Sequence, residues 1–292
     1  MLNRQKNESR MSILDIDELE TFSFLFRGKA GNKLAEKILH WLSIDKINQV
    51  YLNSLKYKGA EFTEHLLKDL GACYAIGNPG NLEKLPKGAF ITIANHPFGG
   101  LDGIMLIDLF ASFRTDYKLM VNKLLSRVKT LYDNFIQVIP TGNEINQLTK
   151  TNIRAIRETL NHLRNGHPAG FFPSGAVSDL SLKDHSIRDR QWQEGILHLI
   201  RSAEVPVLPV RFFDLNSAFF YFLGLINWRI RLLRLPTELF NKGEKILRVG
   251  IGKLISVEEQ LMFPDPESFG TYLRNAVYKM PEPDIFIPRN EL

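Results

Sequence analysis

The stretch AFITIANHPFGGLDGIMLIDLF, from Ala89 to Phe110, passes from a short apolar run through a turn into a second apolar run. His96 stands before a proline, a position that disfavours helical backbone angles, so it should be extended at the end of a strand. Gly99 and Gly100 allow a sharp turn and a close approach of another molecule. A helix should begin near Leu101. The stretch therefore predicts a strand, a tight turn and a helix.

The same alternation continues along the chain. Apolar runs of strand length are ACYAI (72–76), AFITIA (89–94), YKLMV (117–121), FIQVI (135–139), AGFF (169–172), VPVLPV (205–210) and ILRVGIG (246–252). Helical stretches are expected at about 101–113, 144–164, 195–203 and 265–280. The runs are apolar throughout, which is typical of strands that are covered on both faces. The pattern predicts an α/β layered domain with a largely parallel sheet.

The first 70 residues have helical periodicity instead. Apolar residues recur every three or four positions, as at Leu34, Ile38 and Trp41 and again at Phe62, Leu66 and Leu70. This spacing is typical of amphipathic helices. We expect a small helical N-terminal region over residues 1–72 and the layered domain over residues 73–292, although no true linker separates them.

Composition narrows the class of protein. The 292 residues are 44% hydrophobic and carry a net charge of +5. This is enough apolar material for a sizeable core, and the basic balance is compatible with nucleic acid, an anionic membrane or an acidic carrier protein. The cations are dispersed and no recognition motif stands out, so we expect no nucleic-acid partner. Cys73 is the single cysteine, which excludes an internal disulfide and predicts a buried, inert thiol in a reducing compartment.

Targeting signals are not recognisable in the sequence. The first 20 residues include acidic side chains and lack an apolar core of signal-peptide length. No apolar run reaches about 18 residues, the length that a membrane-spanning helix needs. We therefore expect a cytoplasmic protein.

The turn after His96 carries candidate chemistry. If the chain folds back, Asp102 can accept a hydrogen bond from one ring N–H of His96 and fix its tautomer. The other nitrogen can then take a proton from a hydroxyl, which is general-base catalysis. The alternative is a purely structural histidine that is hydrogen-bonded at the end of a strand.

NHPFGGLDG (95–103) resembles the first conserved block of the glycerolipid acyltransferases, which include glycerol-3-phosphate and lysophosphatidic acid acyltransferases. The family has four residues between His and Asp, whereas five stand here, Pro97 to Leu101. One position rotates a helical side chain by about 100°, and the flexible glycine pair is expected to restore the contact. The block is more similar to a hemolysin-like bacterial subgroup, which includes enzymes that esterify lyso-forms of amino-acid-containing lipids.

FPSGAVS (172–178) resembles the third block of the family, which is associated with the acceptor head group. The family's glutamate is replaced by Ser174 and its arginine by Val177. An arginine fork suits phosphate, so its loss argues against a glycerol-phosphate acceptor. Nearby cations could substitute or could be solvated surface charge: Lys183, Arg188 and Arg190. A Ser174 nucleophile is disfavoured, because the nucleophile elbow requires Gly-x-Ser-x-Gly.

The other blocks are weaker. FIQVIPTGN (135–143) has a strand and a turn but no basic residue for block two, and VPVLPV matches the apolar fourth block. WQEGILHLI (192–200) and LRVGIGKLI (247–255) resemble the helix and the late strand that follow. The resemblance covers roughly residues 85–256 and implies an acyltransferase domain over 73–292. It implies His96 and Asp102 as catalytic residues and a substrate-binding set of Asn95, Gly99, Gly100, Phe172, Pro173, Ser174, Gly175 and Ser178.

One segment combines aromatic residues with cations. SAFFYFLGLINWRIRLLRLPTELFNKGEK (217–245) has the composition of an interfacial segment on anionic lipid. The alternative is that its phenylalanines are core residues and its arginines a solvated edge.

Together these features predict a peripheral O-acyltransferase on the inner face of the cytoplasmic membrane. His96 would deprotonate a lysolipid hydroxyl, and backbone N–H groups near Gly99–Gly100 or Gly175 would stabilise the oxyanion. The resemblance implies acyl carrier protein or coenzyme A as the acyl donor, with no bound cofactor and no metal. The alternatives are a 1-acylglycerol-3-phosphate acyltransferase and a lipid- or carrier-binding protein that has lost catalysis.

Overall fold

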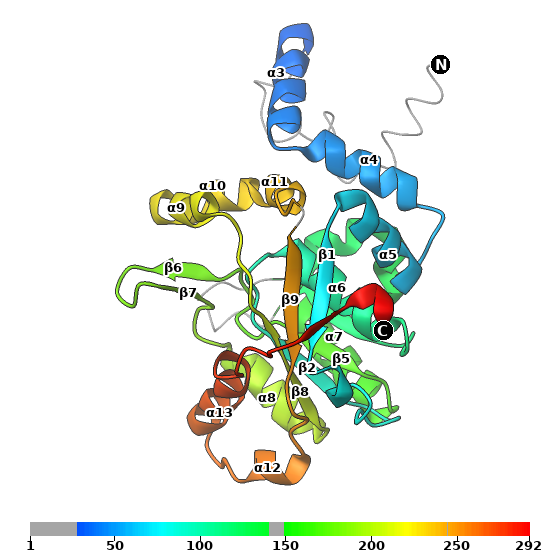
Figure 1. Cartoon of the computed structure of the whole chain (residues 1–292), viewed down its shortest axis with the longest axis vertical. Helices are drawn as coiled ribbons and strands as arrows, with labels where there is room; N and C mark the ends of the chain where they lie inside the picture. The colour runs from blue at the N-terminus through cyan, green and yellow to red at the C-terminus, as the bar shows by residue number, and fades with distance from the viewer. Residues whose placement is uncertain (1–27, 140–148, 244) are drawn as a thin grey trace.

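The computed structural model describes residues 28–139, 149–243 and 245–292, which form an eight-stranded sheet between layers of helices (Figure 1). The strand order is β10-β1-β9-β8-β2-β5-β3-β4. The strands are β1 Cys73–Gly77, β2 Ile91–Ala94, β3 Lys118–Asn122, β4 Phe135–Val138, β5 Ala169–Phe171, β8 Val207–Phe212, β9 Ile246–Ile251 and β10 Phe286–Pro288. A separate antiparallel hairpin pairs β6 Asp179–Ser181 with β7 Ser186–Arg188.

The sheet is largely parallel, as predicted. Strands β8, β2, β5, β3 and β4 run in one direction, and β1 runs parallel to β9. Antiparallel pairing occurs where β9 joins β8 and where β10 joins β1. All seven predicted strands are present, whereas β10 and the β6–β7 hairpin were not predicted. Each of these three strands is three residues long. The hairpin strands β6 and β7 contain polar residues, and β10 is a short apolar stretch that ends in a proline.

The α-helices cover both faces of the sheet. They are α3 Gly28–Trp41, α4 Ile44–Ser54, α5 Gly59–Leu70, α6 Gly100–Ala111, α7 Lys150–Arg164, α8 Glu194–Ala203, α9 Ala218–Ile226, α10 Trp228–Leu233, α11 Leu235–Phe240, α12 Val257–Leu261 and α13 Pro266–Tyr278. Short 3₁₀ helices span Pro79–Asn81, Lys123–Arg127, Lys129–Asn134 and Arg289–Glu291. The four predicted helices after residue 100 are confirmed within a few residues, except that 144–148 lies outside the described residues. No helix of the described ranges combines the length and the apolar character that crossing a bilayer requires.

Two hydrophobic clusters divide the core between the faces. One contains residues of α5 and α6 with alternate residues of the strands, such as Phe62, Phe110 and Ala94. The other contains residues of α7, α8 and α13 with the strand residues between them, such as Ile91 and Ile93. This alternation is the two-residue period of a strand, and it yields a three-layer arrangement.

The N-terminal helices precede the sheet, as expected. Phe62, Leu67 and Leu70 of α5 lie in the same core cluster as α6, so the last of these helices packs against the layered domain. The boundary at residue 72 stays a prediction. Cys73 is exposed rather than buried. It is the first residue of β1, and the side chains become buried only from Tyr74 onward.

Gly170, in the middle of β5, is required by its packing. A Cβ atom there would lie 2.0 Å from the Tyr117 hydroxyl and 2.7 Å from the Thr92 hydroxyl, and these buried hydroxyls share a hydrogen bond of 2.6 Å. Gly170→Ala should therefore lower the free energy of unfolding by about 3 kcal/mol, through overpacking and a broken buried hydrogen bond. Urea denaturation measures this change. Gly195→Ala is the matched control, because no atom lies within 4 Å of its added Cβ; equal stability of the two variants would contradict the prediction.

Candidate active site

The turn between β2 and α6 depends on Gly99. Gly99 caps α6 with φ 83° and ψ −106°, a backbone conformation that residues with a Cβ avoid. An added Cβ would also lie 2.9 Å from the Leu235 side chain of α11. Gly100 has open space around it and begins the helix. Of the predicted glycine pair, Gly99 makes the sharp turn.

The turn brings Asp102 onto His96, as predicted across the longer spacing. His96 Nδ1 lies 3.0 Å from Asp102 Oδ2, and the Phe98 backbone N–H donates to the same oxygen at 3.0 Å. Asp102 is completely buried and stands in the first turn of α6, where the helix dipole favours a carboxylate. The extra residue is absorbed by the turn, so the contact does not need the family's four-residue spacing.

The imidazole is held on two sides and remains partly accessible. Its ring stacks on Phe172 with centroids 4.0 Å apart, and 17% of the His96 side chain is exposed. Because Asp102 engages Nδ1, Nε2 is the ring nitrogen that can accept a proton. Phe172, predicted in the substrate-binding set, therefore lies directly against the candidate general base.

The electrostatics favour a protonated His96. Burial lowers the pKa of His96, but the charge and hydrogen bond of Asp102 and the charge of Asp189 outweigh it, so the pKa lies above its ordinary value of 6.5. A general base must be unprotonated, so kcat/KM should rise with pH with a midpoint above 6.5. Asp102→Asn removes charge that stabilises the imidazolium and should move this midpoint to lower pH. A pH profile of kcat/KM for both proteins measures the shift, and an unmoved midpoint would contradict it.

The third block meets the first through main-chain and carboxylate contacts. The Ser178 backbone N–H donates to the His96 carbonyl at 2.9 Å, and the Ser178 hydroxyl donates to Asp189 Oδ1 at 2.6 Å. Asp189 also accepts the His96 backbone N–H at 3.1 Å. Asp189 was not predicted, because no spacing in the sequence marks it. It is buried between the two blocks, and burial raises its pKa.

The remaining predicted residues make local contacts. The Asn95 amide donates to the Phe212 carbonyl at 2.9 Å and accepts the Phe212 N–H at 2.8 Å, so it fixes the end of β2 beside β8. The Ser174 hydroxyl donates to the Ala176 carbonyl at 2.7 Å within its own turn. The Pro173 carbonyl accepts the Gln193 N–H at 2.9 Å. Gly175 has φ 63°, and its Cβ would collide with Gln193. Pro173, Ser174 and Gly175 lie in the loop that follows Phe172, the residue stacked on His96.

A buried polar network in and around α9–α11 contacts the turn after His96. The Asn216 amide donates to the Pro97 carbonyl at 3.1 Å, and the Tyr221 hydroxyl donates to the same oxygen at 3.0 Å. Lys242 donates to Asn216 at 2.5 Å and pairs with Glu238 at 3.5 Å. These residues were also missed, because they lie more than a hundred positions from the turn.

The arginines near block three are already paired with carboxylates. Arg190 pairs with Asp179, and Arg188 pairs with Asp184 on the exposed hairpin. Arg231 of α10 is buried, pairs with Asp179 at 2.5 Å and donates to the Ser178 carbonyl at 3.0 Å. In the described part of the chain, no cluster of three His, Cys, Asp or Glu side chains is arranged to hold a metal ion. The candidate site thus presents a His–Asp pair beside a backbone turn.

Comparison with known proteins assigns the chain to a family. A sequence model of an acyltransferase family matches residues 29–275, and the chain belongs to this family. It is similar to the lyso-glycine lipid O-acyltransferase of Bacteroides thetaiotaomicron, with 30% identity over 84% of this chain and 88% of that protein. It is also similar to the lyso-glycine lipid O-acyltransferase of Phocaeicola vulgatus, with 26% identity over 94% of this chain and all of that protein.

A solved structure also resembles the chain. It is the 1-acyl-sn-glycerophosphate acyltransferase PlsC from Thermotoga maritima, with a TM-score of 0.46, 15% sequence identity and coverage of 85% of this chain and 93% of that one. The family match and the two relatives bear out the resemblance of the sequence blocks to lysolipid acyltransferases. The chain is an acyl-transferring enzyme of this group.

Proposed function

We propose that this enzyme transfers a fatty acyl group from an acyl thioester to the hydroxyl of a lyso-aminolipid in membrane lipid biosynthesis. The observation that carries the proposal is the contact of 3.0 Å between His96 Nδ1 and Asp102 Oδ2, which leaves Nε2 as the nitrogen that would take a proton from the acceptor hydroxyl. The two relatives are named for a lyso-glycine lipid, which supports an acceptor of this class.

The proposed reaction is a direct acyl transfer in which His96 acts as the general base. His96 Nε2 takes the proton of the acceptor hydroxyl while its oxygen attacks the thioester carbonyl. The tetrahedral oxyanion collapses, the C–S bond breaks, and the thiolate receives the proton from the imidazolium. Asp102 stabilises the imidazolium and keeps the tautomer. The oxyanion donors would be the N–H groups of Gly99 and Gly100 at the start of α6, because the Gly175 N–H already donates to the Phe172 carbonyl at 2.9 Å.

The acceptor head group is argued from block three. Val177 replaces the family's arginine and is buried, and Arg190 and Arg231 both pair with Asp179. An acceptor with a phosphate would gain most from an arginine that is free to form a bidentate pair. This arrangement favours a lyso-aminolipid. Lysophosphatidic acid is the second candidate, because the family includes acyltransferases for that acceptor.

The proposal includes the acyl donor and the cellular location of the enzyme. The donor is a thioester of acyl carrier protein or coenzyme A, and no bound cofactor takes part. The enzyme works as a peripheral protein on the inner face of the cytoplasmic membrane. Support comes from α9 and α10, which expose several large apolar side chains: Phe219, Phe222, Leu225, Ile226, Trp228, Ile230 and Leu233.

The test is acyl transfer by the purified enzyme. Palmitoyl-carrier protein and palmitoyl-coenzyme A would each be offered with lyso-glycine lipid, other lyso-aminolipids and lysophosphatidic acid. Esterified lyso-aminolipid as the main product supports the proposal. A preference for lysophosphatidic acid would establish the second candidate. Absence of any product from folded enzyme that binds vesicles would favour the alternative of a lipid- or carrier-binding protein.

A further inference from the structure

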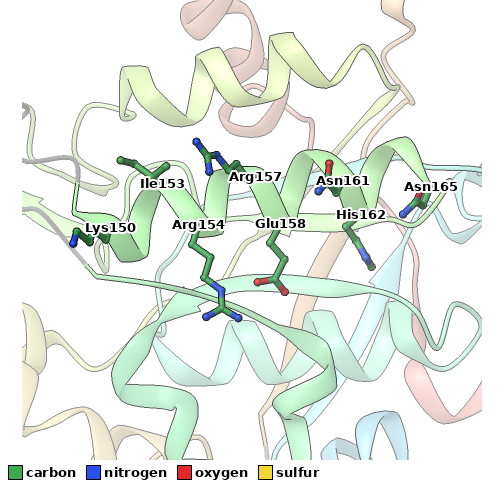
Figure 2. A pocket seen from close by; sticks show the side chains of 8 residues that line it. All are labelled: Lys150, Ile153, Arg154, Arg157, Glu158, Asn161, His162 and Asn165. Atoms are coloured by element: carbon green, nitrogen blue, oxygen red, sulfur yellow. The ribbon is translucent and has the colours of Figure 1, made fainter.

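Helix α7 carries an open hollow on its outer face that the proposed reaction does not use. The hollow has a volume of about 680 Å³. Figure 2 shows Lys150 at the N-terminal end of the helix, Arg157 on one side, and Arg154 beside Glu158 on the other. The three cations follow each other at spacings of four and three residues and span about 10 Å along the helix.

The charge of this face is not neutralised within the described part of the chain. Lys150, Arg154 and Arg157 make no hydrogen bond or ion pair with a residue of the described ranges. Glu158 is the acidic residue of the hollow, and it pairs with Lys118 at 3.4 Å. The first turn of α7 contains no acidic residue, so the positive end of the helix dipole adds to the potential. Cations gathered on one hollow attract an acidic partner.

The basic face begins at the edge of the sheet that carries the site. Strands β2, β5, β3 and β4 are parallel neighbours, so their C-terminal ends share one edge. His96 follows β2, and the Asn152 amide in the first turn of α7 exchanges two hydrogen bonds of 2.9 Å with Ile139, just after β4. Three strand spacings amount to about 14 Å. A long flexible arm could bridge this separation.

We infer that the basic face of α7 (Lys150, Arg154 and Arg157) is the docking surface for an acidic acyl carrier protein. The inference rests on the proposed thioester-dependent transfer and names the donor's partner surface. Carboxylates on a helix of the carrier would meet the row of cations, and the acyl-bearing arm would reach from α7 to His96. The exposed Ile153 lies between the charges and offers one apolar contact.

The shape of the face favours a carrier protein over the other acidic ligands. Coenzyme A is a small ligand, and small ligands are mostly bound in enclosed, largely apolar pockets; this hollow is open and lined mainly by polar side chains. A membrane surface favours aromatic and aliphatic residues beside cations. Those residues lie on α9 and α10, whereas Ile153 is the apolar side chain of this hollow.

A double charge reversal tests the inference. Binding of holo acyl carrier protein to the intact enzyme needs no catalysis, and Arg154→Glu with Arg157→Glu should raise its Kd about tenfold or more. KM for palmitoyl-carrier protein should rise in parallel, and KM for palmitoyl-coenzyme A should stay within about twofold. The matched control is Lys253→Glu with Lys279→Glu, which changes the net charge equally at two exposed positions.

The outcomes separate docking from catalysis. An unchanged Kd in the α7 variant, or an equal rise in the control, would overturn the docking surface. A wild-type enzyme that uses only coenzyme A and binds no carrier would overturn it while leaving acyl transfer intact. A wild-type enzyme that binds the carrier through α7 but transfers no acyl group would support the surface and contradict the proposed reaction.

Discussion

Replacing His96 with alanine should lower kcat/KM for acyl transfer by about 100- to 10,000-fold, the range that general-base catalysis contributes. The variant loses the nitrogen that takes the hydroxyl proton, and Asp102 is left buried without the imidazole. KM for the acyl donor should change little, because the proton acceptor acts mainly in the transition state. Steady-state kinetics with a saturating lysolipid acceptor would measure both constants.

The control for this prediction is another histidine. His198 lies exposed on α8, so His198→Ala should keep the activity of the wild-type enzyme. Circular dichroism and thermal unfolding would verify that the His96 variant is folded, since a buried Asp102 without its partner is expected to cost some stability. Full activity of folded His96→Ala would show that His96 is not the general base, and would return it to the structural role considered for a histidine at the end of a strand.

The local part of the site could be predicted from the sequence because the residues that make it are neighbours. The proline after His96 and the glycines after Phe98 specify an extended residue and a sharp turn, and Asp102 returns to the ring within six positions. The parallel strands were also predictable, because each contains a short apolar run, and the central strands β2 and β8 are buried on both faces. Local backbone preference and burial act over a few residues, and a single sequence displays them directly.

The second layer of the site could not be predicted in this way. Asp189 binds the His96 backbone from 93 positions away, and Asn216 reaches the Pro97 carbonyl from 119 positions away. Such contacts depend on how β8 and the hairpin pack against the turn, which no periodicity records. The β10 strand was missed because its apolar stretch is only three residues long and ends in a proline, and its pairing with β1 at the edge of the sheet connects distant parts of the chain.

Packing buries some of the aromatic and basic residues of the segment 217–245 and leaves others exposed. Phe220 and Tyr221 are buried against Val177, which agrees with the alternative that aromatic residues of this segment belong to the core. Arg231 is buried too. Phe219, Phe222 and Trp228 are exposed by 52%, 53% and 51%. Figure 1 shows α9–α11 as a layer beyond one end of the strands. The exposed aromatic residues therefore form a face that is available to a membrane.

Replacing Phe219, Phe222 and Trp228 together with serine should weaken partitioning onto anionic vesicles by about 100-fold or more. Each half-exposed aromatic ring that enters the interface is worth about 1–2 kcal/mol, and three of them amount to at least about 3 kcal/mol, where 1.4 kcal/mol is a factor of ten. Cosedimentation with vesicles measures the partition coefficient. The matched control changes Leu261, Met262 and Ile285, which are 67%, 67% and 73% exposed elsewhere on the chain, and should bind like the wild type. Equal partitioning of the two triple variants would show that α9 and α10 do not bind the enzyme to lipid. A loss of partitioning in the aromatic variant alone would assign membrane contact to this face. In that case, acyl transfer to a detergent-dispersed acceptor should be preserved, because the His96 site is unaltered.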